Sequence, residues 1–120
     1  MILLHYPSWT SSRKAKVWLE ENNIEFEIRH TVKQTPSKEE FLMWQKNSGV
    51  DKKKFVNTNG KRFKEMELKD KIDDMSKEEL FELISADGML VKRPIIIGEE
   101  FVISGFKLKE LEDMKENLGL

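Results

Sequence analysis

Two short runs of β-branched and aromatic residues near the C-terminal end constrain the fold of this chain more than any other feature. Residues 95–97 are Ile-Ile-Ile and residues 101–103 are Phe-Val-Ile, and only Gly-Glu-Glu separates them. Such runs are too short for helices and are typical of strands, and the short connection predicts an antiparallel hairpin. We expect its second strand to end near Ser104 and Gly105. The chain must therefore build its core around a sheet.

The N-terminal part predicts a strand, a helix and a second strand. Residues 2–5 form an apolar run that ends before Pro7, which suits a buried strand. The run lacks the basic residues and cleavage pattern of an export signal, so we expect a cytoplasmic location. Hydroxyl side chains at residues 8–12 offer caps for a helix that extends to about residue 23. Residues 24–30 then alternate between apolar and charged, which predicts a strand with one buried face.

Cap signals predict helices between residues 35 and 88. Ser37 and Glu40 have the spacing of a capping box, with Pro36 at the first helical position, and Gly49 is suited to end that helix. A second capping box, Ser-Lys-Glu-Glu, starts at residue 76 and opens a helix that is expected to end where Gly88 takes a left-handed conformation. After the hairpin, apolar residues at three- and four-residue intervals predict a terminal helix that packs on the sheet: Leu108, Leu111, Met114 and Leu118.

The order of these elements predicts an α/β fold. It is β-α-β, then a helical insert at about residues 35–88, then β-β-α, within one domain over residues 1–120. A right-handed crossover makes the first two strands parallel, so the sheet is mixed. This order is that of the thioredoxin-like fold, in which a proline before the third strand lies opposite the N-terminus of the first helix. Pro94 holds that position and is expected to have a structural role there.

The chain contains no cysteine, which excludes disulfides, Cys-ligated metal centres and every mechanism with a thiolate nucleophile. His5 and His30 lie in separate segments without metal-binding spacing, and no glycine-rich nucleotide motif is present, so we expect neither a metal nor a cofactor. A net charge of −1 argues against direct binding of nucleic acid. No apolar stretch reaches the ~18 residues of a membrane span, so a membrane is not an expected partner.

Four segments give the chain a resemblance to a known family. It resembles the arsenate reductase (ArsC)/Spx family of thioredoxin-like proteins over essentially its whole length. The Leu-Val-Lys-Arg-Pro run that ends at Pro94 is the most discriminating segment. The matching segments are Tyr6-Pro7-Ser8 with Arg13-Lys14-Ala15 and Trp18-Leu19, Phe55-Val56-Asn57-Thr58 with Gly60, residues 87–94 with the following Ile-rich strand, and Gly105-Phe106-Lys107.

The departures from the family concern its chemistry. Members place a catalytic Cys, or a Cys-x-x-Cys pair, before the Arg-Lys-Ala helix, whose N-terminus stabilises a thiolate and an oxyanion. Trp9 and Ser12 occupy these positions here. Reductase members also surround the Cys with arginines, of which Arg93 is retained, whereas the others fall near Asn57 and Gly105. The resemblance therefore implies the fold and argues against arsenate reduction.

Residues around the first helix N-terminus are candidates for an anion site. Hydroxyls, backbone N–H groups and guanidinium groups would converge there, although helix capping explains the same residues. The candidates are Thr10, Ser11, Ser12, Arg13 and Arg93. Trp9 is either a contact residue for a partner or a plug in the substrate groove. His5 and His30 are expected to be structural.

A partner site is implied by the resemblance alone. In Spx-like regulators, the insert around the residue matching Gly49 docks on the C-terminal domain of the RNA polymerase α subunit. Gly49 is equally explained as a helix cap. The eight basic residues between positions 52 and 71 alternate with acidic ones, which favours a solvated helical surface.

Three hypotheses for function follow. The first is a non-redox domain for protein interaction or transcription regulation, without enzymatic activity. The second is a binder of a small oxyanion or a glutathione-type molecule that uses residues 10–13 with Arg93. The third is that Ser12 replaces a cysteine of an arsenate reductase-like protein, which would restore at most one thiol because Trp9 is not a near-isostere of Cys.

Overall fold

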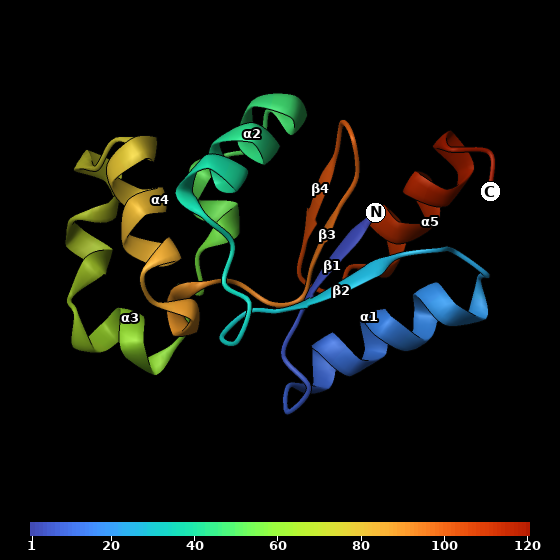
Figure 1. Ribbon diagram of the computed structural model, residues 1–120, viewed down its shortest axis with the longest axis horizontal. Helices are drawn as coiled ribbons and strands as arrows, with labels where there is room; N and C mark the ends of the chain where they lie inside the picture. Colours follow the sequence, from blue (N-terminus) through green and yellow to red (C-terminus); the bar gives the residue numbers. More distant parts are fainter.

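The computed structural model describes residues 1–120 and has a four-stranded mixed sheet at its centre (Figure 1). Its strands are β1 (Ile2–His5), β2 (Glu27–His30), β3 (Ile95–Ile97) and β4 (Val102–Ser104), in the order β2-β1-β3-β4. β1 and β2 are parallel, whereas β3 is antiparallel to both β1 and β4. The predicted mixed sheet and hairpin are therefore confirmed.

Helices cover both faces of the sheet. α1 (Thr10–Glu21) and α5 (Leu108–Asn117) share a hydrophobic cluster with Leu3 and Ile96. Leu4 belongs instead to a larger cluster with the helical insert. Because neighbouring residues of a strand point to opposite faces, the insert packs on the face that α1 and α5 leave open. No helix is long and apolar enough to cross a bilayer.

The insert between β2 and β3 contains α2 (Lys38–Ser48), α3 (Lys61–Glu65) and α4 (Lys77–Ser85). Single turns of 3₁₀ helix connect them, at Lys52–Phe55, Leu68–Asp70, Ile72–Asp74 and Gly88–Leu90. Three fully buried aromatic rings hold the insert together, and their centroids lie 5.5–5.6 Å apart: Phe41, Phe55 and Phe81. Edge-to-face and offset contacts at this separation stabilise aromatic clusters.

Both capping boxes form as predicted. The Ser37 hydroxyl accepts a hydrogen bond from the Glu40 N–H at 3.1 Å, and the Glu40 carboxylate accepts one from the Ser37 N–H at 3.0 Å. Gly49 ends α2 with a left-handed φ of 72°, as expected. Pro36 was placed wrongly, because Ser37 is the N-cap and Pro36 therefore precedes the helix.

Gly88 also departs from the prediction. It does not take a left-handed conformation, and Ala86 is the C-cap of α4. A β-carbon at Gly88 would lie 2.3 Å from the carbonyl oxygen of Thr31. Glycine is thus required here because the backbone of the insert approaches the chain after β2, not because of a helix end.

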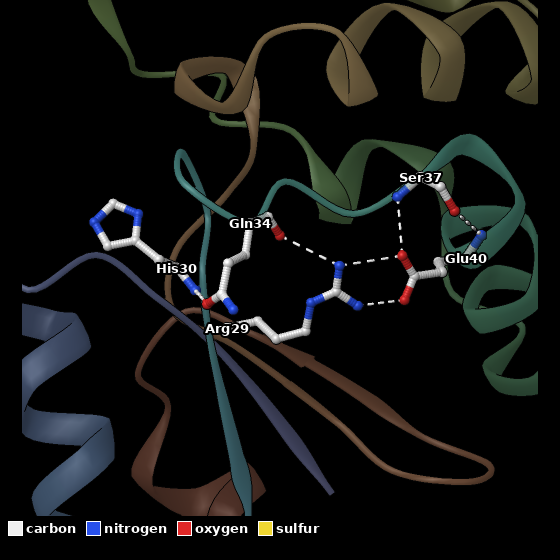
Figure 2. Close-up of polar contacts among 5 residues, drawn as sticks. All are labelled: Arg29, His30, Gln34, Ser37 and Glu40. Carbon is white, nitrogen blue, oxygen red and sulfur yellow. Dashed lines mark hydrogen bonds and ion pairs between the residues drawn. The ribbon is translucent and has the colours of Figure 1, made fainter.

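A partly buried ion pair between Arg29 and Glu40 links β2 to α2. Figure 2 shows the Arg29 guanidinium against both oxygens of the Glu40 carboxylate. Arg29 Nη2 also donates to the Gln34 carbonyl, and the Gln34 side chain accepts from the His30 N–H (Figure 2). Hydrogen bonding to Arg29 is the main cause of a lowered Glu40 pKa. The capping carboxylate therefore also fixes the insert to the sheet.

Two amphipathic patterns are less regular than the sequence indicates. β2 begins only at Glu27, and Ile28 is 40% exposed although the alternation predicted a buried face. β2 is an edge strand, so fewer neighbours cover it. On α5, Leu111 and Met114 are buried, whereas Leu108 and the C-cap residue Leu118 are each 49% exposed.

Candidate functional site

The N-terminus of α1 lacks the expected hydroxyl cap. Trp9 is the N-cap residue, and its side chain makes no capping hydrogen bond because indole has no acceptor for an N–H. Ser12 is fully buried, and its hydroxyl accepts a hydrogen bond from the Tyr6 N–H at 3.3 Å. Ser12 therefore supports the loop that leads from β1 into α1.

Arg13 is likewise held by the loop. Its Nη1 donates to the Pro7 carbonyl at 2.9 Å, and its Nη2 donates to the Thr10 hydroxyl at 3.4 Å. Thr10 is exposed, while Ser11 is partly buried. Of the proposed anion ligands on this segment, Thr10, Ser12 and Arg13 already have hydrogen-bond partners within the chain.

Arg93 is the most unusual side chain of the site. It is 4% exposed, and its Nε and Nη1 atoms have no hydrogen-bond partner. Its Cζ atom lies 4.4 Å from the ring centroid of Tyr6 and 5.2 Å from that of Trp9. Aromatic faces attract a guanidinium, which compensates part of its desolvation. Burial nevertheless lowers the Arg93 pKa.

Pro94 follows Arg93 through a cis peptide bond. The structure therefore brings Trp9, Ser12, Arg93 and Pro94 into one region, since Trp9 contacts Arg93 and Ser12 holds the same loop through Tyr6. Gly49 is not part of this region, because it ends α2 in the insert. The site and the implied partner surface are separate features.

The positions where reductases carry further arginines have other roles. Asn57 is 7% exposed, and its N–H donates to the Leu90 carbonyl at 2.8 Å. Gly105 has a φ of 86°, and its N–H donates to the Pro94 carbonyl at 2.8 Å. Neither residue supplies a positive charge near Arg93.

Sequence reasoning missed a group of three lysines beside α1. A hollow of about 660 Å³ is lined by Lys54, Lys92 and Lys107, none of which forms a salt bridge. A fourth lysine of the lining, Lys53, pairs with Asp73, and Ser11 of α1 also lines the hollow. Burial, followed by the charges of Lys107, Arg93 and Lys54, lowers the Lys92 pKa. Asp51 is the single carboxylate in the lining. Only the presence of Lys92 and Lys107 within two of the family segments could have indicated this group.

The two histidines have different surroundings. His5 is 6% exposed and its Nδ1 atom has no partner. Burial is the main cause of its lowered pKa, and the charges of Lys16, His30 and Arg13 add to it. His30 Nδ1 accepts hydrogen bonds from the N–H groups of residues 32 and 33, both at 3.1 Å, which is a structural role in the turn after β2.

Comparison with known proteins shows the family to which this chain belongs. The model of the ArsC family matches residues 4–114. The chain belongs to the ArsC family. Its relatives include YusI of Bacillus subtilis, with 45% identity over 90% of this chain and 92% of that protein. The regulatory protein MgsR of the same organism shares 34% identity over 88% of this chain and 82% of its own length.

Other ArsC-family relatives extend the comparison. The global transcriptional regulator Spx of Listeria monocytogenes is 33% identical over 88% of this chain and 79% of its own length. A crystal structure of a putative ArsC family related protein from Bacteroides fragilis superposes with a TM-score of 0.88 and 44% identity, covering 95% of this chain and 96% of that one. The arsenate reductase of Vibrio cholerae has a TM-score of 0.80 at 21% identity, over 93% of this chain and 94% of its own, and supports the fold. This chain is thus a thioredoxin-like ArsC-family protein without cysteine.

Proposed function

We propose that this ArsC-family protein acts without redox chemistry, as a protein-interaction domain of the transcription-regulatory type. The observation that carries the proposal is that Trp9 occupies the N-cap of α1 and stacks on the buried Arg93, where a reductase would hold its thiol and oxyanion. Similarity to MgsR and Spx, both regulators, supports the second part.

Serine chemistry is a poor substitute for the missing thiol. The Ser12 hydroxyl is fully buried and already accepts a hydrogen bond from Tyr6. A serine needs an adjacent base to become a nucleophile, and no side chain accepts a hydrogen bond from its hydroxyl. We therefore expect no arsenate reduction with either glutathione- or thioredoxin-coupled assays. Measurable turnover in either assay would refute the proposal.

The partner that the family resemblance implies is the C-terminal domain of the RNA polymerase α subunit. The surface proposed for it surrounds Gly49, which is exposed, and a β-carbon there would meet no atom within 4 Å. Packing thus leaves room for a partner against this residue. Met43, on the same helix, is 51% exposed and adds apolar surface.

A titration of isotope-labelled protein with this polymerase domain tests the proposal. We expect chemical-shift changes centred on Gly49, and loss of binding in Gly49→Arg. Gly119→Arg is the matched control, because Gly119 also has a left-handed φ of 69° and open space around it. Equal affinity of both variants, or absence of any shift with the unmodified chain, would reject this partner.

A second candidate function, binding of a small oxyanion or a glutathione-type molecule, is favoured by the unpartnered Nε and Nη1 atoms of Arg93 and by the nearby lysines. Trp9 covers Arg93, so Trp9→Ala should raise the affinity for phosphate or arsenate if Arg93 is the ligand. Shifts at residues 10–13 that disappear in Arg93→Ala would support this function. Titration with phosphate, arsenate and glutathione without saturation would exclude it.

A further inference from the structure

A groove runs between α5 and the β3–β4 hairpin. Its volume is about 600 Å³, and its apolar lining includes Phe101 and Ile103 from β4 and the preceding turn, and Met114 and Leu118 from the end of α5. Leu118 is 49% exposed and Phe101 is partly buried, so the groove offers apolar surface to solvent. In Figure 1, α5 and the hairpin tip lie in the upper part of the view, whereas the N-terminus of α1 lies in the lower part.

Carboxylates line both sides of this groove. Glu99 and Glu100 lie in the hairpin turn on one side, and Glu110 and Asp113 lie on α5 on the other. All four are exposed and none forms a salt bridge. No Lys, Arg or His side chain lines the groove. Met1 also lines the groove and brings the positively charged α-amino group, so the four carboxylates outnumber it and leave a net negative charge around an apolar floor.

The single sign of charge is a local property of the groove. Elsewhere on α5 the charged residues are of both signs, with Lys109 and Lys115 near Glu112 and Glu116. Lys115 is directed to α1, where its Nζ atom donates to the Asn22 side chain at 2.8 Å. A solvated helix commonly mixes charges in this way. The groove side of α5 departs from that pattern because its charged side chains are all carboxylates.

We propose that this groove binds a basic amphipathic helix of a partner protein. An apolar stripe of that helix would contact the floor at Phe101, Met114 and Leu118, and Lys or Arg residues on both sides of the stripe would face the two carboxylate pairs. Helices recognised in grooves present apolar anchors at intervals of three and four residues. Complementary charge mainly sets the specificity and the rate of such an encounter. This inference is independent of the function proposed above, because it uses a different surface.

The probe for this surface is a 14-residue designed peptide of Leu and Lys, with Leu at helical spacing and Lys elsewhere. We expect chemical-shift changes of the labelled protein at Phe101, Ile103 and Leu118, and weaker binding as salt is raised. A peptide with Glu in place of Lys should not bind. Shifts distributed over acidic surfaces outside the groove would overturn the proposal.

Charge reversal within α5 supplies a matched pair of variants. Glu110→Lys with Asp113→Lys should weaken binding of the Leu/Lys peptide at least tenfold, whereas Glu112→Lys with Glu116→Lys changes the net charge equally and should leave the affinity within about twofold. Equal weakening by both pairs would show attraction to net charge alone and would overturn the proposal.

Leu118→Ser tests the apolar floor without a change of charge. The variant should still fold, because Leu118 is half exposed. We expect it to weaken peptide binding about fivefold or more. Sedimentation of the unmodified protein adds a check on the occupant. A dimer that dissociates in Leu118→Ser would assign the groove to a second copy of this chain and would reject a basic helix as its occupant.

Discussion

Arg93 has a place in the structure that depends on two aromatic rings. Its guanidinium is buried without a carboxylate partner, and the rings of Tyr6 and Trp9 provide its nearest compensating interactions. A charge in such surroundings is costly unless other groups stabilise it. Trp9 therefore has a structural reason to be at this position in addition to any partner contact.

Removal of the indole should destabilise the fold. Trp9→Ala is expected to lower the free energy of unfolding by about 1 kcal/mol, because Arg93 loses one of its two ring contacts. Trp9→Phe keeps an aromatic face and should lose less. Urea denaturation followed by circular dichroism measures both changes. Equal stability of Trp9→Ala and the unmodified chain would contradict this role of Trp9.

His5 predicts a specific dependence of stability on pH. Burial lowers its pKa below 6.5 in the folded state, so the unfolded chain binds a proton at a higher pH than the folded one. This effect is absent well above pH 6.5 and reduces stability as the pH falls below that value. Between pH 7.5 and 5.5, we expect His5→Gln to lose less unfolding free energy than the unmodified chain. The same loss in both proteins would show that His5 does not titrate abnormally.

The two capped helices provide an internal comparison. Glu40 and Glu79 make the same capping-box contacts, but only Glu40 also pairs with Arg29 of β2. Glu40→Gln should therefore cost about 1 kcal/mol more unfolding free energy than Glu79→Gln. The excess should vanish in an Arg29→Gln background. Because the Glu40 pKa is lowered, its contribution is present above about pH 4.5 and is lost as the pH falls through the folded-state pKa.

Local elements could be predicted from the sequence because their signals lie within a few residues. The capping boxes at Ser37 and Ser76, the left-handed Gly49 and the hairpin with its turn all follow from such short spacings. Gly88 was misjudged since its constraint is the distant Thr31 carbonyl. A pattern along the chain cannot reveal an approach between segments.

The candidate site was predictable only in part for the same reason. The helix N-terminus followed from the hydroxyl residues at positions 8–12, the role of Arg93 from the family resemblance, and the absence of thiols from the absence of cysteine in the sequence. The contacts of Arg93 with Tyr6 and Trp9 join segments more than 80 residues apart. The lysine-lined hollow similarly combines residues 54, 92 and 107. Only the folded chain brings these residues together.

The two hydrophobic clusters share the strands of one sheet, so they should unfold together. Leu3 and Ile96 belong to the smaller cluster, while Leu4 and Ile95 belong to the larger one. Separate loss of either cluster would expose one face of β1 and β3. A small chain with such a shared sheet is expected to unfold in one transition.

Single-tryptophan variants test this cooperativity. Trp44 reports on the larger cluster and Trp18 on the smaller one, because each packs against it. One variant keeps Trp44 and replaces the other two tryptophans by Phe, and a second keeps Trp18 in the same way. In each variant, the urea midpoints from fluorescence and from circular dichroism should coincide. A lower fluorescence midpoint for Trp44 would show that the insert unfolds on its own.

The turn after β2 has a consequence for the behaviour of the protein at high concentration. β2 is an edge strand on which the Glu27 N–H donates to the Met1 carbonyl, and the N–H of Thr31, the next residue after β2, donates to the His5 carbonyl. The backbone groups of Ile28 and His30 therefore point outward from the sheet. Gln34 occupies both groups of His30, since its side chain accepts from the His30 N–H and its own N–H donates to the His30 carbonyl. Ile28 is then the one β2 residue whose outward N–H and carbonyl groups could pair with another strand. An incoming strand finds too short a template to add to the sheet, which protects the molecule from edge-to-edge aggregation.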